Sequence, residues 1–315
     1  MRLGVVGNLV AAVAGVVSLR VAGEGTRPTF FLLYIPHHPF AVLSIACFVV
    51  ALMLRRHLLA GLSLVTLLVA LFPLMGLRLH GGRAANGRRL RLLTYNVFYA
   101  KLDRTALARE IAAASADLVL LQASRSTFSK GELHAQLPDM TLQLNDEFVL
   151  ATKLPLRAVE FPDRFPDGVA PCWAAYTLEG PIGPFRVVNV HPYSARSGLM
   201  DGADPREGIE NRRRQIAGAT EAAARSTEPV LIVGDTNLPP LSALGRKYFA
   251  PYHDAFDDVG FGFGYTFPTK IPWMRIDRAL GSPQIRFLSV RVMPRGASDH
   301  RALMVDFEIE PPRVR

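Results

Sequence analysis

Hydrophobic and polar positions divide the chain into two unlike parts. Apolar residues dominate three long stretches at residues 3–22, 30–54 and 58–79, and up to Gly87 the chain carries seven Arg, one acidic residue and no Lys. Each stretch approaches the ~20 residues that cross the apolar core of a bilayer as a helix. A secretory signal peptide explains one such stretch but not three in succession. We predict about three transmembrane helices over residues 1–80; the alternative is a buried hydrophobic hairpin in a soluble protein.

The second apolar stretch contains an interruption. Pro36-His37-His38-Pro39 lies inside it, and proline in a helix interior removes a hydrogen bond and clashes with the preceding turn. The membrane-spanning part of this stretch is therefore predicted to run only over residues 40–54.

Arginines near the ends of the helices give conflicting indications of orientation. Arg55-Arg56-His57 forms a tight hairpin typical of the cytoplasmic side, which places the N-terminus inside and everything after Leu79 outside. Counting Arg20, Arg27 and the arginines over residues 78–91 gives the opposite result. We favour an extracytoplasmic domain, because several arginines after the third stretch belong to a linker and to the first strand of that domain.

Beyond the third stretch the pattern changes to short strands bounded by turns. Residues 81–89 are predicted to form a flexible linker and residues 90–315 a folded domain. Strands are expected at 90–97, 117–122, 147–152, 173–178, 185–191, 229–234, 275–280, 285–293 and 302–309, and helices at 103–115 and 206–226. Many strands and few helices in separate runs predict a layered α+β sandwich rather than a doubly wound parallel sheet.

Charge and cysteine content add little about the substrate. The chain has a formal net charge of +9, yet from residue 88 onward 29 basic side chains face 26 acidic ones. This near balance is not the basic footprint of a nucleic-acid-binding domain. Cys47 and Cys172 lie in different settings and form no obvious disulfide, so they do not report the compartment.

The aromatic run over residues 261–265 is predicted either to face substrate or lipid, or to pack against the core.

Polar residues recur in a fixed order near the ends of these strands. The elements are Thr94-Tyr95-Asn96, Asn189-Val190-His191, Gly234-Asp235-Thr236-Asn237, Arg275-Ile276-Asp277 and Ser298-Asp299-His300. Over residues 90–310 they resemble the endonuclease/exonuclease/phosphatase superfamily. The resemblance implies a DNase I-like, four-layered αββα sandwich, preceded here by the N-terminal helices. It also implies a site at one edge between two sheets, and metal-dependent hydrolysis of a phosphate ester.

The same resemblance implies a division of labour among oxygen and amide side chains. Asn96 and Asp299 contribute to a site for Mg²⁺ or Mn²⁺, cations that prefer hard oxygen ligands. Asp235 orients or deprotonates the attacking water, and Asn237 holds a phosphate oxygen. These assignments are expectations carried over from the family's motifs.

Two histidines complete the expected machinery. By the resemblance, Asp277 orients His300, and His191 binds or protonates an ester oxygen near the leaving group. The first pairing also has an independent reason, because a carboxylate on one imidazole nitrogen fixes the tautomer and raises the basicity of the other. Arg275 is expected to be either a structural partner or a phosphate clamp.

One position departs from the family pattern. The family has a Leu-Gln-Glu whose glutamate is a principal metal ligand, whereas this chain reads Leu121-Gln122-Ala123. The change removes a negative charge and ligand oxygens, so metal affinity should fall. Glu132, Asp146 or Glu147 is a candidate replacement from a nearby loop. Gln122 should point to the opposite face of its strand from position 123, which makes its carbonyl a poor substitute.

Two hypotheses follow. The first is a membrane-anchored, metal-dependent phosphoesterase of the phosphodiesterase, nuclease or phospholipid-phosphatase type. The second is a pseudoenzyme that binds a phosphorylated ligand or partner without turning it over, because Ala123 replaces the usual glutamate. Nucleic acid, phospholipid and small phosphoesters all stay open as substrates, and the sequence predicts no protein partner.

Overall fold

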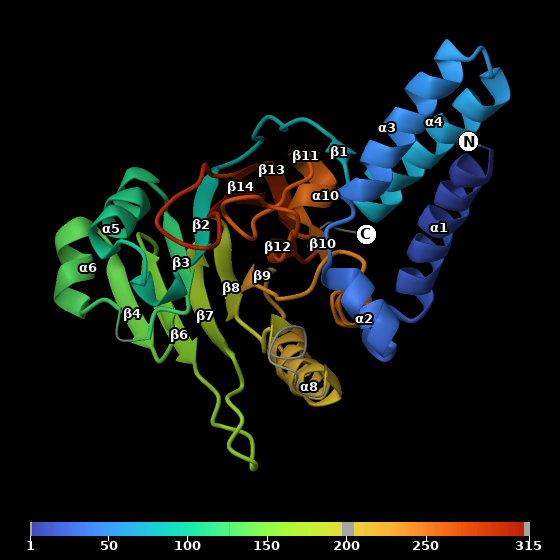
Figure 1. Cartoon of the computed structure of the whole chain (residues 1–315). Coiled ribbons are helices and arrows are strands. Elements are labelled where there is room, and N and C mark those ends of the chain that lie inside the picture. The colour runs from blue at the N-terminus through green and yellow to red at the C-terminus, as the bar shows by residue number, and fades with distance from the viewer. Residues whose placement is uncertain (1, 126, 197–204, 312–315) are drawn as a thin grey trace.

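The apolar N-terminal region folds into a helical bundle that projects from a β-rich domain (Figure 1). The computed structural model describes residues 2–125, 127–196 and 205–311. Two helices are long and apolar enough to cross a membrane: α1 (Arg2–Val21), and α4 (His57–Val69) with its continuation η2 (Ala70–Leu74). A third span is reached only if α2 (Arg27–Tyr34) and α3 (His38–Met53), bent by 73° to one another, are taken together.

The break between α2 and α3 falls at the interruption predicted from the sequence. Ile35 is extended and caps α2, and His38 begins α3 with Pro39 in its first turn. Proline is tolerated there, because the first N–H groups of a helix have no intrahelical partner. The long second stretch is therefore two helices. The short α2 packs on the β-rich domain, where Phe30 and Leu33 are buried in one cluster with Ala195.

Small side chains bring the helices of the bundle together. The buried side of α1 includes Ala12 and Gly15, and Asn8 donates a hydrogen bond of 2.9 Å from Nδ2 to Oγ of Ser44 on α3. Small residues at helix contacts and polar pairs between helices are typical of packing in membranes. The outer faces of α1, α3 and α4 expose valine and leucine side chains. This exposed apolar surface suits contact with lipid.

Two six-stranded sheets form the rest of the chain. In spatial order the first contains β10 (His253–Asp254), β12 (Asp277–Gly281), β9 (Val230–Asp235), β8 (Gly183–Val190), β7 (Trp173–Gly180) and β6 (Leu156–Glu160). The second contains β13 (Ile285–Val292), β14 (Leu303–Ile309), β2 (Leu90–Asn96), β3 (Leu118–Gln122), β5 (Phe148–Thr152) and β4 (Thr141–Asn145). The β2–β3 and β8–β9 pairs are parallel and the other pairs antiparallel.

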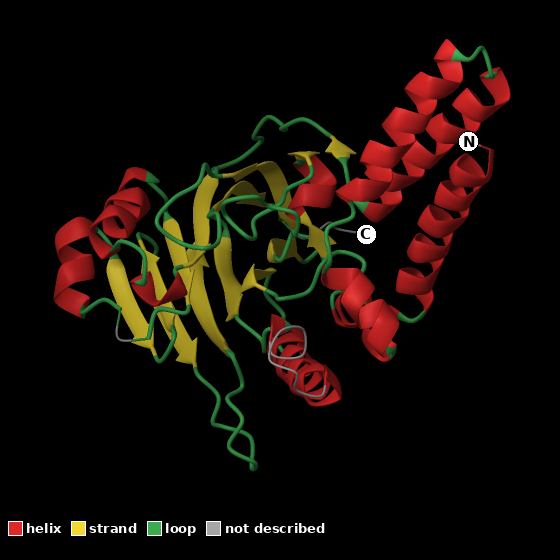
Figure 2. Ribbon diagram, in the orientation of Figure 1, coloured by secondary structure: helices red, strands yellow, loops and turns green. Residues whose placement is uncertain are grey.

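The sheets stack face to face, with helices on both outer surfaces (Figure 2). The helices of this part are α5 (Arg104–Ala113), α6 (Lys130–Gln136), α8 (Pro205–Ala224), α9 (Ala243–Tyr248) and α10 (Ala255–Val259). Strand β3 shows how the layers arise, because successive side chains point to opposite faces. Leu120 lies in the core between the sheets, whereas Leu121 packs in the cluster under α5 and α6. The predicted four-layered αββα sandwich is confirmed.

The connector between the two parts is bonded to the domain along its length. Strand β1 (Arg78–Leu79) pairs with β11 (Phe261–Gly262). The backbone N–H groups of Asn86 and Gly87 donate to the carboxylate of Glu308 at 2.9 and 2.7 Å. The segment expected to be a flexible linker is therefore held to β14, which fixes the bundle relative to the sheets.

Candidate active site

The polar residues singled out from the sequence meet at one edge of the two sheets. Asn96 ends β2, Asp235 ends β9 and Asp277 begins β12, while His191 directly follows β8. Asp277 and Asp235 are register partners in the β12–β9 pair. Because parallel strands end at the same edge and the two sheets face each other, these termini converge.

His300 lies between two carboxylates. Its Nδ1 is 2.8 Å from Oδ2 of Asp277, and its Nε2 is 3.6 Å from Oδ2 of Asp235. Burial disfavours the charged imidazolium, but Asp277 and Asp235 outweigh burial and raise the pKa of His300 to about 9. The ring is therefore protonated at neutral pH, with Nδ1–H directed to Asp277 and Nε2 turned to Asp235. The predicted pairing of Asp277 with His300 is present in the structure.

A second carboxylate–histidine pair lies across Asp235 from the first. His191 Nδ1 is 2.8 Å from Oε2 of Glu147, and His191 Nε2 is 3.7 Å from Oδ2 of Asp235. Burial lowers the pKa of His191, but Glu147 and Asp235 more than offset this and raise it above its ordinary value. Asn96 donates from Nδ2 to the same Asp235 oxygen at 2.9 Å. Asp235 is therefore flanked by two imidazoles and an amide.

Asn237 is held rigidly beside these groups. Its backbone N–H donates to Oδ1 of Asp235 at 2.9 Å, and its side-chain Nδ2 donates to the carbonyl of Pro192 at 2.9 Å. Its φ of 49° lies in the left-handed region, which asparagine tolerates better than most residues. The hydroxyl of Tyr34, on α2, donates to the carbonyl of Asn237 at 3.0 Å. A residue of the N-terminal helices thus supports the site directly.

These side chains line a cavity of about 470 Å³, which we call the catalytic cavity. Its polar floor contains Asp235, Asn237 and His300. Its other walls are mainly apolar or aromatic and include Phe98, Tyr99, Phe267, Trp273, Met274 and Ile276. Arg196 is the one arginine or lysine among its described lining residues. A mainly apolar cavity with a few polar groups grouped on one side is typical of small-molecule sites.

The cavity contains oxygen-bearing side chains of the kind that bind a divalent cation, and the Oδ1 of one of them, Asn96, also accepts from the N–H of Phe98 at 3.1 Å. Asp299 and Asn96 both line the cavity. Burial and the neighbouring Asp235 raise the pKa of Asp299, although His300 opposes them. A carboxylate in such surroundings gains from a bound cation. Asp235, Asp277 and His300 also lie within metal-ligand distance of one another, but the Nδ1–H···Oδ2 bond within that group places a proton between His300 and Asp277. We therefore interpret those two residues as a hydrogen-bonded pair rather than as ligands.

Ala123 lies in the wall of the same cavity. Strand β3 ends at Gln122, and Ala123 follows in a left-handed conformation with φ of 51°. Gln122 turns away and donates from Nε2 to Oδ1 of Asn189 at 2.7 Å. Position 123 therefore faces the site, as the family's glutamate would.

The three candidate replacement carboxylates behave differently. Glu132 forms a capping box at the start of α6 and pairs with Arg104. Asp146 pairs with Arg125 at 2.6 Å. Glu147 alone reaches the site, through His191. Its backbone carbonyl also accepts from the N–H of Ser124 at 3.0 Å, which places it beside Ala123.

Two contributors were not assigned from the sequence. Tyr34 lies in the second apolar stretch, ahead of the part predicted to span the membrane, and nothing in the local pattern indicates a contact with Asn237. Glu147 was one of three equivalent candidates, and only the antiparallel pairing of β3 with β5 places it beside the end of β3. Arg275 is buried and pairs with Asp257 at 2.9 Å, so of the two expectations for it the structural partner is the one observed.

The sequence profile of the endonuclease/exonuclease/phosphatase family matches residues 93–300. The chain belongs to this family. The match begins within β2 and ends at His300, so it includes the first sheet, most of the second and the polar site, and stops before β14. No curated protein sequence matches the chain at a significant level.

Solved structures share the fold at low sequence identity. An endonuclease/exonuclease/phosphatase from Beutenbergia cavernae DSM 12333 is 19% identical with a TM-score of 0.54, over 73% of this chain and 74% of that one. A family protein from Bacteroides thetaiotaomicron is 13% identical with a TM-score of 0.57, over 72% and 100%. A 3′-5′ exonuclease from Neisseria meningitidis is 16% identical with a TM-score of 0.52, over 70% and 100%. At these identities the likeness shows the fold alone.

Proposed function

We propose that this protein is a membrane-anchored, divalent-metal-dependent hydrolase of phosphate esters. The observation that carries the proposal is Asp235 at the floor of the catalytic cavity, flanked by two histidines that are each backed by a carboxylate. A carboxylate beside two histidines can accept a proton from water while the imidazole N–H groups stabilise developing negative charge. Membership of the family supports the reaction class.

The chain's own residues divide the work as follows. Asp235 positions and deprotonates the attacking water. His300, held by Asp277, donates from Nε2 to a phosphoryl oxygen. His191, held by Glu147, donates to an ester oxygen on the leaving-group side, and Asn237 holds a further phosphoryl oxygen. Each of these side chains except Asp277 and Glu147 lines the catalytic cavity.

Asn96 and Asp299 would hold the cation, for which we propose Mg²⁺ or Mn²⁺. A divalent cation supplies charge neutralisation at the phosphoryl oxygens. The Glu147 backbone follows Ala123 closely and its carboxylate contacts His191, and we propose that it supplies part of the negative charge that position 123 lacks. The proposed location is the membrane, through α1, α3 and α4, with the domain on the extracytoplasmic side. Pairing of Arg78 with Asp257 and of Arg91 with Asp306 supports counting these arginines with the domain.

The second candidate function is binding of a phosphorylated ligand without turnover. Ala123 in the cavity wall favours it, because the family's glutamate oxygens are missing there. The two candidates differ in one measurable respect. A hydrolase turns over in the natural sequence, whereas a pseudoenzyme is silent until a carboxylate is restored at position 123.

The test is hydrolysis of bis(p-nitrophenyl) phosphate by the full chain in detergent micelles, over a titration of Mg²⁺ and of Mn²⁺. We expect metal-dependent turnover that falls by about 10²–10⁴-fold in His300→Ala and Asp235→Asn. The matched controls are His134→Ala and Asp163→Asn, because both residues are exposed and distant from the catalytic cavity. Turnover near the natural level in both site variants would refute the mechanism. A silent natural chain together with an active Ala123→Glu variant would establish the pseudoenzyme.

A further inference from the structure

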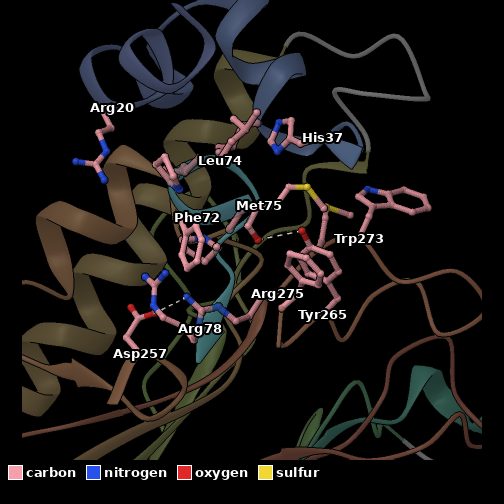
Figure 3. Close-up of a pocket in the computed structure, with 18 of the residues that line it drawn as sticks. Arg20, His37, Phe72, Leu74, Met75, Arg78, Asp257, Tyr265, Trp273 and Arg275 are labelled. Atoms are coloured by element: carbon pink, nitrogen blue, oxygen red, sulfur yellow. Dashed lines mark hydrogen bonds and ion pairs between the residues drawn. The ribbon is translucent and has the colours of Figure 1, made fainter. Parts of the chain in front are cut away.

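A second cavity, of about 500 Å³, lies where the helical bundle meets the sheets (Figure 3). Its wall includes Arg20 at the end of α1 and Phe72 from η2, together with Trp273 and Met274 from the domain. We call it the seam pocket. Trp273 and Met274 also line the catalytic cavity, so the two cavities share a wall.

The charge of the seam pocket is strongly positive. Four arginines and one carboxylate, Asp257, are among its described lining residues. Arg78 and Arg275 share that carboxylate at 3.0 and 2.9 Å, and Figure 3 shows these three side chains together. The other two arginines, Arg20 and Arg246, have no carboxylate partner in the part of the chain that the structure describes. The pocket therefore holds uncompensated positive charge.

Arg246 is nonetheless fixed in place. Its guanidinium donates to two backbone carbonyls, those of Arg20 and Leu241, both at 2.5 Å. The carboxylate of Glu24 accepts from Ser242 Oγ and from the backbone N–H of Ala243, and among the described residues it forms no ion pair with Arg246. Arg246 thus holds the end of α1 against α9 and keeps its charge beside that of Arg20.

The remaining wall of the seam pocket is apolar and aromatic. Leu33, Ile35, Phe72 and Leu74 come from the N-terminal helices and their ends, and Phe263 comes from the aromatic run of the domain. Arg20 near the end of α1 and Leu74 at the end of η2 both line the pocket, so it lies where these apolar helices end next to the domain. In a membrane this depth is the headgroup level, where basic side chains attract anionic lipids.

We propose that the seam pocket binds an anionic phospholipid, with the headgroup phosphate between Arg20 and Arg246 and an acyl chain along the apolar wall. The proposal rests on the membrane anchoring put forward above, but not on hydrolysis. It adds a ligand site separate from the catalytic cavity. The lipid would lie against Trp273, on the other side of the wall from the catalytic residues.

The two tryptophans of the chain make the site directly observable. The sequence contains only Trp173 and Trp273, and Trp173→Phe leaves Trp273 as the sole fluorophore. The full-length variant is reconstituted into phosphatidylcholine vesicles with a rising fraction of either brominated phosphatidylglycerol or brominated phosphatidylcholine. Bromine quenches tryptophan only near contact, so the two titrations give the preference of the pocket for the anionic lipid.

We expect half-maximal quenching at a lower fraction of phosphatidylglycerol than of phosphatidylcholine. Arg20→Gln should reduce this preference about fivefold, the effect expected for one basic side chain near an anionic surface. Arg20 is exposed, and its side chain forms no hydrogen bond or ion pair with any residue that the structure describes, so the variant should fold. Arg246→Gln should reduce the preference further, because it also releases the end of α1.

The matched control is Arg56→Gln, an exposed arginine in the hairpin at the far end of the bundle. It should leave the preference unchanged. Equal quenching by the two lipids in the parent protein, or an equal loss of preference in Arg20→Gln and Arg56→Gln, would overturn the proposal. No turnover is needed for this measurement, so an inactive protein that still prefers the anionic lipid would refute the proposed hydrolase and leave the lipid site standing.

Discussion

Tyr34 on α2 contacts the backbone of Asn237 in the catalytic cavity. We predict that this one hydroxyl on the N-terminal helices stabilises the folded protein. In Tyr34→Phe the ring remains and only the hydroxyl is lost. That hydroxyl donates to the carbonyl of Asn237 at 3.0 Å and accepts from Nη1 of Arg212 at 2.9 Å. Arg212 is fully buried, and its Nε donates separately to the carbonyl of Tyr193. The substitution therefore leaves a buried Nη1 and a buried carbonyl without these partners.

The size of the expected loss of stability follows from the two hydrogen bonds of the Tyr34 hydroxyl. A hydrogen bond to a charged group contributes about 1.5–3 kcal/mol and a neutral one about 0.5–1.5 kcal/mol, and both partners, Arg212 and Asn237, are buried. We expect Tyr34→Phe to lower the free energy of unfolding by about 3 kcal/mol. For a domain of ~150–250 residues each kcal/mol lowers the melting temperature by about 2–4 °C, so the expected shift is about 6–12 °C.

The assay is thermal unfolding of the full chain in detergent, followed by circular dichroism at a fixed scan rate. Tyr252→Phe is the matched control, because this half-buried tyrosine lies outside both cavities and no described residue bonds its hydroxyl. The control should melt within about 2 °C of the natural chain, as is usual for substitutions that break no specific interaction. A decrease in melting temperature in Tyr34→Phe no larger than that of the control would refute the reasoning. The hydroxyl would then contribute no stability beyond that of the aromatic ring.

Three further predictions concern the site and acid stability. Ala123→Glu adds a carboxylate to the cavity wall and should lower the half-saturating Mn²⁺ concentration about tenfold; an unchanged value would show that position 123 does not reach the cation. Glu147→Gln keeps a hydrogen-bond acceptor for His191 and should lower kcat by about 10-fold. Glu147→Ala removes the acceptor and should lower kcat by about 10²-fold. Rates equal to that of the natural chain would exclude a positioning role for Glu147. Burial raises the pKa of Asp306, but Arg91 outweighs burial and holds it below its ordinary value. The stabilisation that the Asp306 carboxylate contributes is therefore present above pH ~4 and lost as pH falls further. The difference in melting temperature between the natural chain and Asp306→Asn should shrink towards pH 2. A difference independent of pH would contradict this assignment.

Much of the fold could be predicted because the buried strands are locally unambiguous. Residues 147–152 were predicted as a strand and β5 covers Phe148–Thr152, and the expected helix at 103–115 appears as α5 with Asp103 capping its start. Strands β4 and β6 were missed. Both lie at sheet edges, and β6 is exposed or half-exposed throughout. An edge strand with little buried surface carries a weak alternating pattern, so its sequence resembles that of a loop.

The candidate site could be predicted to the extent that its residues belong to local motifs. Asp235, Asp277 and His300 each belong to a short element at a strand end, and the structure places them together. The approach of Glu147 to His191 depends on the pairing of β3 with β5 and on the stacking of the two sheets, neither of which the residues around Glu147 specify. Tyr34 is separated from Asn237 by 203 positions, so only the three-dimensional arrangement reveals that contact.

The placement of α2 bears on which ligands the catalytic cavity can admit. Tyr34 and Trp273 line the catalytic cavity, and the indole N–H of Trp273 donates to the carbonyl of Tyr34 at 3.1 Å. One wall of the cavity is therefore built jointly by the domain and by α2, which leads directly into the apolar helix α3. Under the membrane anchoring proposed above, this cavity would lie close to the bilayer, and Arg196 is the one basic side chain among its described lining residues. Because nucleic-acid binding draws on many basic side chains, we propose a phosphoester that resides in or near the membrane as the substrate rather than a long soluble polymer.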